Sequence, residues 1–197
     1  NSENAIKSKP GALVVKTGKY TGRSPNAKFI VKDETVKKEI DWAYVQGMDP
    51  KVYKQILQDF YESEIYNSNL YETSVFAGHK DFSGISIKIN CELAWHSMAS
   101  LNMFQEIEEN DNYDFSLYYV PSFTKDPFVL ISFEEGLIII SGTKYAGEMK
   151  KSVFTILNHI FPSENIFPMH CSINLDTNLE NPAIFSGLSG TGKTTLS

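Results

Sequence analysis

Residues 183–197 read AIFSGLSGTGKTTLS, an apolar run followed by a glycine-rich loop and a lysine. Gly187-x4-Gly192-Lys193-Thr194 fits the phosphate-loop pattern G-x-x-x-x-G-K-[ST], in which backbone N–H groups surround a polyphosphate. The lysine of such a loop reaches the outer phosphates, and its last hydroxyl residue binds Mg²⁺. The pattern normally follows a strand and opens a helix. The segment therefore predicts nucleotide binding by an α/β protein.

Length and composition narrow the class of protein. The 197 residues fit one domain, or one domain and the start of a second. A net charge of −6 without a basic run argues against nucleic acid as the main partner. Cys91 and Cys171 form no C-x-x-C pair, which fits a reducing compartment. No apolar run approaches the ~18–20 residues that cross a bilayer. We expect a soluble, cytoplasmic protein, and the sequence implies neither a membrane nor a protein partner.

Strand and helix patterns are mixed along the remaining chain, which is typical of the α/β class. Apolar runs predict strands at 12–15, 28–31, 70–76, 128–133, 137–141, 169–175 and 182–185. Helical patterns cover 35–42, 51–61, 92–104 and 147–160. Residues 134–136 predict a hairpin turn, and a loop is expected around Gly78 and Gly84.

The segment Thr17–Pro25, TGKYTGRSP, contains Arg23, the only arginine among 18 basic residues. Arginine is a planar fork that grips carboxylate or phosphate at two points, whereas lysine is a point charge. The two glycines of the segment let its backbone approach a ligand. An anion clamp is one interpretation, and a plain surface turn in a lysine-rich chain is the other.

Two further segments carry residues capable of chemistry. Gly142–Lys151, GTKYAGEMKK, begins where a strand ends and a helix starts, a common place for a site in α/β proteins. The adjacent Lys150 and Lys151 disfavour each other's charge, which can leave a neutral amine able to bind a metal. A solvated basic helix turn is the alternative. His170, in the segment MHCS, is either a metal ligand or a hydrogen-bonded structural histidine. The other histidines show no ligand spacing.

Taken together, these segments resemble the ATP-dependent phosphoenolpyruvate carboxykinases. Five of them match in order and spacing: Thr17–Pro25 (TGKYTGRSP), Glu92–Trp95 (ELAW), Gly142–Lys151 (GTKYAGEMKK), Met169–Ser172 (MHCS) and Gly187–Ser197 (GLSGTGKTTLS). The loop is similar to that of the ATP-using class, since the GTP-using class has a cysteine there. The resemblance implies a mixed-sheet α/β N-terminal domain over residues 1–180, with residues 181–197 opening the nucleotide-binding domain. The separate chain is then expected to be inactive.

The family converts oxaloacetate and ATP into phosphoenolpyruvate, ADP and carbon dioxide. The resemblance implies that Arg23 grips the substrate's carboxylate or the transferred phosphoryl group. Tyr145 would line the substrate pocket, and Lys151 would also contact the substrate. Lys151, as a neutral amine, and His170 would bind Mn²⁺.

The phosphate loop would bind ATP in this interpretation. Lys193 would neutralise the outer phosphates and act in catalysis beside Arg23 and Lys151, and Thr194 would bind Mg²⁺. The residues expected at the nucleotide are Gly187, Leu188, Ser189, Gly190, Thr191, Gly192, Lys193, Thr194 and Thr195.

The chain also departs from the family pattern. Gly84, Lys88 and Glu106 stand where the family usually has arginines. These departures favour an alternative, a divergent non-catalytic member that binds a nucleotide or another anion. They also leave Arg23 as the remaining arginine for an anion clamp.

Overall fold

The structure is a computed structural model of the chain, and it describes residues 5–188 and 190–196. The chain divides into one compact unit that ends at Thr155 and a second that begins at Ile156. The domain division expected between residues 180 and 181 stays a prediction.

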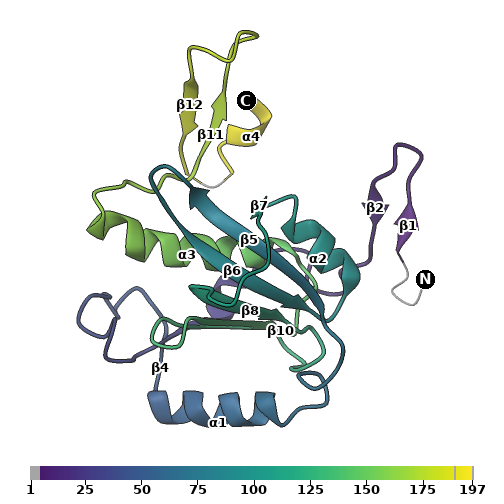
Figure 1. The fold of residues 1–197 in the computed structure, drawn as a ribbon, viewed down its shortest axis with the longest axis vertical. Coiled ribbons are helices and arrows are strands. Elements are labelled where there is room, and N and C mark those ends of the chain that lie inside the picture. Colours follow the sequence, from purple (N-terminus) through teal and green to yellow (C-terminus); the bar gives the residue numbers. More distant parts are fainter. Residues whose placement is uncertain (1–4, 189, 197) are drawn as a thin grey trace. The chain divides into compact units, whose positions relative to one another are not determined.

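The first unit is built on one mixed sheet with the strand order β4-β3-β9-β10-β8-β6-β5-β7 (Figure 1). In chain order its strands are β3 (Lys28–Val31), β4 (Gly47–Met48), β5 (Tyr71–His79), β6 (Ser83–Cys91), β7 (Gln105–Glu106), β8 (Phe115–Tyr119), β9 (Phe128–Ser132) and β10 (Leu137–Ser141). β10 runs antiparallel to β9 and parallel to β8, and β3 runs parallel to β9. The expected α/β class with a mixed sheet is confirmed.

Helices cover both faces of this sheet (Figure 1). The elements outside the sheet are the hairpin β1 (Ile6–Lys7) and β2 (Leu13–Val14), the 3-10 turn η1 (Pro25–Ala27), α1 (Pro50–Tyr61), α2 (Ala94–Ser100) and α3 (Gly147–Ser163). Tyr53 and Phe60 of α1 pack with Leu137 and Ile139 of β10. Ile138 and Ile140 point to the opposite face and are equally buried. β10 is therefore covered on both sides, as its unbroken apolar run requires.

The helix α1 begins as the sequence predicts. The carboxylate of Asp49 accepts a hydrogen bond from the backbone N–H of Lys51 at 2.8 Å. Pro50 occupies the first helical position, where its missing N–H costs nothing. The expected strand at residues 28–31 and the expected hairpin across residues 134–136 are also confirmed.

Other expectations are wrong. Residues 35–42 form turns and not a helix, because side chains there bond to nearby groups in competition with helical bonds. The Thr35 hydroxyl donates to the Asp33 carboxylate, and the indole N–H of Trp42 donates to the carbonyl of Lys37. The helix expected at 92–104 is only α2, Ala94–Ser100.

The loop expected around Gly78 and Gly84 is instead the end of β5 and the start of β6, where these glycines pair across the two strands. β6 and β8 were not expected as strands, although Ile85, Ile87 and Ile89 alternate with polar residues along β6.

The second unit contains the rest of α3, the antiparallel pair β11 (Cys171–Asn174) and β12 (Ala183–Ser186), and the short helix α4 (Lys193–Leu196). Cys171 lies opposite Ser186 and Asn174 lies opposite Ala183. Most side chains of both strands are exposed or half-buried. β12 is the strand expected before the phosphate loop.

Candidate active site

The loop that carries Arg23 is fixed on both sides of that residue. The backbone N–H of Ser24 donates to Oε1 of Glu148 at 2.5 Å, which joins the loop to the first turn of α3. Before Arg23, the hydroxyl of Tyr20 donates to Oδ1 of Asp126 at 3.0 Å. Within residues 5–188 and 190–196 the guanidinium of Arg23 makes no hydrogen bond or ion pair, and it is exposed. Its planar donor face is thus presented on an anchored loop.

The segment leading to Tyr145 follows directly from β10. Gly142 has a φ of +65°, and a Cβ there would collide with the carbonyl oxygen of Asp126. Only glycine fits this turn without strain. The hydroxyl of Thr143 then accepts from the backbone N–H of Tyr145 at 3.1 Å. The backbone before Tyr145 is therefore fixed by local contacts.

His96, on α2, contacts the same segment, residues 142–145. Its Nε2 donates to the carbonyl of Lys144 at 3.0 Å, since a carbonyl can only accept. Its ring stacks on Tyr119, with centroids 3.9 Å apart. Burial lowers the pKa of His96 to about 4. This histidine is a neutral structural donor, as expected from its lack of ligand spacing.

Lys28, on β3, holds the turn of α3 that contains Lys151. Its ammonium donates to the carbonyl of Lys151 and to the hydroxyl of Thr155, each at 3.1 Å. Burial lowers the pKa of Lys28, and the carboxylate of Glu148 opposes that shift. The charges of Arg23 and Lys151 lower the same pKa. Lys28 therefore lies within electrostatic reach of one buried carboxylate and of two other basic side chains.

A cavity of about 270 Å³ opens between residues 17–20 and residues 142–144. Its lining includes the cationic side chains Lys19, Lys125 and Lys144, with Asp126 as the carboxylate. The hollow thus lies between the segments that precede Arg23 and Tyr145, and its charged lining residues are mainly basic.

The expected phosphate loop lies in the second unit, between β12 and α4. Gly190 and Gly192 have φ values of +83° and +87°, which suit glycine. The ammonium of Lys193 donates to the carbonyls of Gly187 and Leu188, both at 2.8 Å. Thr191 donates its hydroxyl to the same Leu188 carbonyl at 2.8 Å. Ser189 and the side chain of Thr194 lie outside the described part, so the Mg²⁺ role of Thr194 stays a prediction.

His170 directly precedes β11 and is exposed. Among the described residues, no group of three or more histidine, cysteine or acidic side chains is placed to hold a metal ion. Lys151 and His170 offer an amine and an imidazole, whereas Mn²⁺ prefers carboxylate, carbonyl and water oxygens. Either side chain fits a manganese site only if oxygen ligands complete it.

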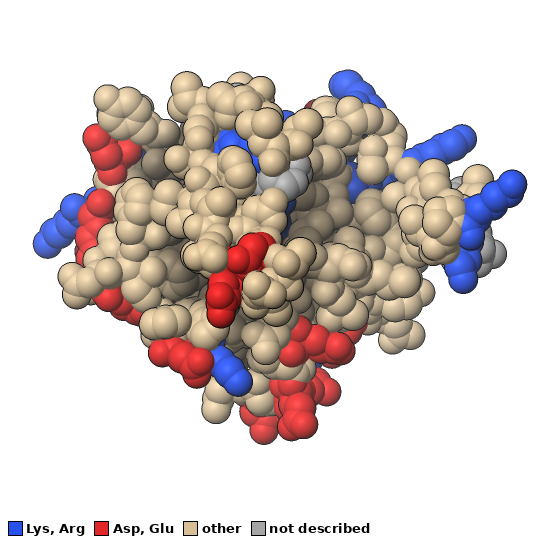
Figure 2. Space-filling model, turned by 90° about the horizontal axis from the view of Figure 1, so that it is seen from above, with Lys and Arg blue, Asp and Glu red and all other residues tan. Residues whose placement is uncertain are grey.

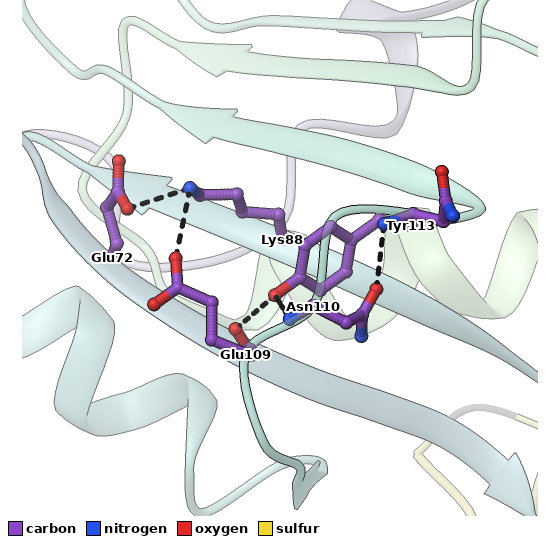
Figure 3. A network of polar contacts seen from close by, with 7 residues as sticks. Glu72, Lys88, Glu109, Asn110 and Tyr113 are labelled. Atoms are coloured by element: carbon purple, nitrogen blue, oxygen red, sulfur yellow. Dashed lines mark hydrogen bonds and ion pairs between the residues drawn. The ribbon is translucent and has the colours of Figure 1, made fainter.

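The three positions where arginines were expected lie in the strands at one edge of the sheet. The ammonium of Lys88 lies 2.9 Å from a carboxylate oxygen of Glu72 and 3.6 Å from one of Glu109 (Figure 3). Gly84 lies on the same strand, where a Cβ would collide with the ring of Phe76. Glu106 is exposed on β7. The ammonium of Lys88 is thus paired with two carboxylates, and Lys88 is far from the Arg23 loop in the sequence.

The charged surface agrees with the acidic composition. Most of the face in Figure 2 belongs to uncharged residues, and some of its basic side chains lie directly beside acidic ones. No helix in the described ranges is both long enough and apolar enough to cross a membrane.

A mixed α/β sheet with an anchored arginine, followed in the chain by a strand, a glycine-rich loop and a lysine, is typical of nucleotide-dependent phosphoryl-transfer enzymes. A family model described as phosphoenolpyruvate carboxykinase matches residues 1–197. The chain belongs to the ATP-dependent phosphoenolpyruvate carboxykinase family.

Curated relatives agree with this membership. The phosphoenolpyruvate carboxykinase (ATP) of Geobacillus thermodenitrificans is 39% identical over 202 residues, which cover 95% of this chain and 38% of the relative. The protein of the same name from Rhodopseudomonas palustris is 40% identical over 206 residues, covering 98% of this chain and 38% of the relative. The chain therefore spans about 38% of the length of these relatives.

Proposed function

We propose that the protein containing this chain converts oxaloacetate and ATP into phosphoenolpyruvate, ADP and carbon dioxide. The match of the family model along residues 1–197 carries this proposal. The basic side chains of Arg23 and Lys28, which lie within electrostatic reach of each other, support it, because both substrates are anions.

Arg23 and Tyr145 serve the organic substrate in this proposal. The guanidinium of Arg23 grips the carboxylate of oxaloacetate or the phosphoryl group in transit, since its fork matches either anion. Tyr145 lines the pocket. Loss of carbon dioxide leaves an enolate, whose oxygen attacks the γ-phosphoryl group of ATP, and nearby positive charge stabilises both anions.

Residues 187–195 bind the phosphates of ATP, with Ser189 among them. The ammonium of Lys193 exchanges its bonds to the Gly187 and Leu188 carbonyls for the outer phosphate oxygens. Thr194 serves the Mg²⁺ that accompanies the nucleotide. Phosphoryl transfer needs in-line positioning and neutralised charge more than covalent chemistry, which suits these residue types.

Lys151, in its neutral form, and His170 hold Mn²⁺ in this proposal, and Lys151 also contacts the substrate. A bound divalent metal supplies Lewis-acid stabilisation of the enolate oxygen. The remaining oxygen ligands must come from water, substrate or other parts of the protein.

The decisive experiment uses a full-length protein that contains this chain. With Mn²⁺, Mg²⁺, ATP and oxaloacetate, it should release phosphoenolpyruvate, and a folded protein without product would overturn the proposal. Arg23→Lys keeps the charge but loses the fork, so kcat/KM should fall by about 100-fold or more. The control Lys9→Arg, at an exposed turn, should leave kcat/KM unchanged.

A second candidate is a non-catalytic member of the family that binds a nucleotide or another anion. The engagement of Lys88 by Glu72 and Glu109, where an arginine was expected, favours it. Calorimetric titration separates the two functions. Binding of ATP without binding of oxaloacetate or phosphoenolpyruvate would support the second.

Two further expectations belong to the proposal. The 197-residue chain by itself should be inactive, since the relatives are much longer. A cytoplasmic location is also proposed, on the basis that both cysteines are free.

A further inference from the structure

Glu148 is a buried carboxylate, and burying a charged group costs free energy because the group loses its hydration. It lies in the first turn of α3 and is only 1% exposed. A buried charge is tolerated only when hydrogen bonds and opposite charges compensate for its lost hydration. The contacts of this side chain should therefore show what it is for.

The hydrogen bond from Ser24 is the first of those contacts. It joins residues 124 positions apart in the sequence. The donor N–H belongs to the residue directly after Arg23, on a loop whose residues 21–23 are exposed. The carboxylate thus holds the backbone of the Arg23 loop.

Positive charge provides the rest of the compensation. The start of a helix favours an acidic side chain. The Glu148 charge acts on Lys28, whose ammonium is bonded to the Lys151 carbonyl and to Thr155. Glu148 and Lys28 therefore link the Arg23 loop to the turn of α3 that carries Lys151.

We propose that Glu148 is a positioning residue for the substrate site, holding the loop of residues 17–25 so that Arg23 keeps a fixed place relative to Lys151. The inference rests on the proposed function, in which Arg23 and Lys151 meet one substrate. Misplacement of a reacting group by about 1 Å can cost about 100-fold in rate. An anchor one residue away from Arg23 is well placed to prevent such a shift.

The chain offers a matched control on the same loop. Tyr20 anchors the loop three residues before Arg23, but its hydrogen bond to Asp126 is exposed. Tyr20→Phe removes that anchor while keeping the ring. If Glu148 acts through Arg23, removing the bond from Ser24 to Glu148 should lower kcat/KM far more than removing the bond from Tyr20 to Asp126.

The test measures steady-state kinetics of the full-length protein. Glu148→Ala should lower kcat/KM for oxaloacetate by about 100-fold and leave the KM for ATP unchanged. Glu148→Gln, whose amide oxygen still accepts from Ser24, should lose about 10-fold or less, and Tyr20→Phe about twofold or less. In an Arg23→Lys background, Glu148→Ala should cost far less than in the wild type, because residues that act together are not additive.

Hydrogen exchange adds a readout independent of turnover. The Ser24 amide should exchange slowly in the wild type and in Glu148→Gln, and rapidly in Glu148→Ala. If Glu148→Ala does not fold, the coupling between Glu148→Gln and Arg23→Lys replaces it.

The outcomes separate the inference from the proposed function. A folded, inactive wild-type protein overturns the proposed function and this inference with it. If the wild type is active, the proposed function stands. The inference alone is then overturned if Glu148→Ala, or the coupling that replaces it, shows no loss specific to oxaloacetate. A variant with lowered thermal stability but a wild-type kcat/KM for oxaloacetate would show a purely structural role and would also overturn it.

Discussion

The two loops expected to bind ligands are held in different ways. The Arg23 loop is bonded to distant parts of its unit, through Ser24 to the buried Glu148 and through Tyr20 to Asp126. In the described part of the phosphate loop, the side chains of Lys193 and Thr191 bond to carbonyls of that same loop. A preorganised loop spends little binding energy on ordering. Under the proposed function, the substrate side is shaped before binding, whereas Lys193 exchanges its carbonyl partners for phosphate oxygens.

The strands that lead into the two sites also differ in how deeply they are buried. β10, which leads into residues 142–145, is buried along its whole length. β11 and β12, which precede the phosphate loop, are largely exposed in this chain. Equal substitutions in the two regions should therefore have unequal effects.

The largest difference is expected between two isoleucines. In the 197-residue chain, Ile139→Ala should lower the free energy of unfolding by about 2–5 kcal/mol, because it opens a cavity in the core. Ile173→Ala, at a side chain that is 59% exposed, should change it by about 0.5 kcal/mol or less. Urea denaturation measures both. Equal losses would show that the second unit is as well packed as the first.

Acid should weaken the support of residues 142–145 through His96, which donates to the carbonyl of Lys144. Since burial lowers its pKa to about 4, the unfolded chain takes up this proton first as pH falls below about 6.5. The neutral histidine's contribution is complete above pH 6.5 and is lost toward pH 4, by up to about 3 kcal/mol. His96→Gln keeps a donor for the Lys144 carbonyl and should flatten this dependence.

The exposed His79 provides the control for that measurement. His79→Gln should keep the wild-type dependence of the unfolding free energy on pH. An unchanged slope in His96→Gln would show that other groups cause the acid sensitivity.

A pair of threonines tests the loops themselves. Thr143→Val leaves the Tyr145 N–H without its acceptor at a side chain that is 2% exposed, and should cost about 1–2 kcal/mol. Thr191→Val removes an exposed bond within the phosphate loop and should cost about 0.5 kcal/mol or less. Thermal unfolding compares the two variants. A larger loss at Thr191 would reverse the proposed difference in anchoring.

The smallest effect is expected at the ion pairs of Lys88, on β6 of the first unit. Lys88→Met breaks the pairs with Glu72 and Glu109, and should cost about 0.5 kcal/mol in low salt and almost nothing at 1 M salt. Unfolding measured at both salt concentrations checks this. A loss of unfolding free energy above about 2 kcal/mol would mean that a substitution is costly wherever it lies in the first unit, even where the side chain is not fully buried.

Local patterns predicted local structure well. The Asp49-Pro50 pair fixed the start of α1, and the apolar runs around residues 134–136 predicted the β9–β10 hairpin, because each signal lies within a few residues. Residues 35–42 carry a helical pattern, yet the bond between Thr35 and Asp33 favours turns. β8 pairs with β6 and β10, and no pattern within its five residues predicts those partners.

The site shows the same limit. The motifs pointed to Arg23, Tyr145 and Lys151, and their roles stay predictions. Glu148 and Lys28 were missed, although Glu148 lies inside the motif GTKYAGEMKK. Their importance depends on contacts across 124 and 123 positions, which periodicity cannot show.

The pairing of β3 with β9 has a consequence for the order of assembly on the ribosome. Lys28 of β3 lies opposite Val129 of β9, so this side of β3 is paired only after about a hundred further residues have been synthesised, whereas its other neighbour, β4, follows it closely in the chain. At roughly 5–20 residues per second, this wait lasts about 5–20 s. The β5–β6 hairpin can close earlier, since its strands are neighbours in the chain. The nascent chain is thus expected to keep Arg23 next to a strand paired on one side only until the centre of its sheet has emerged.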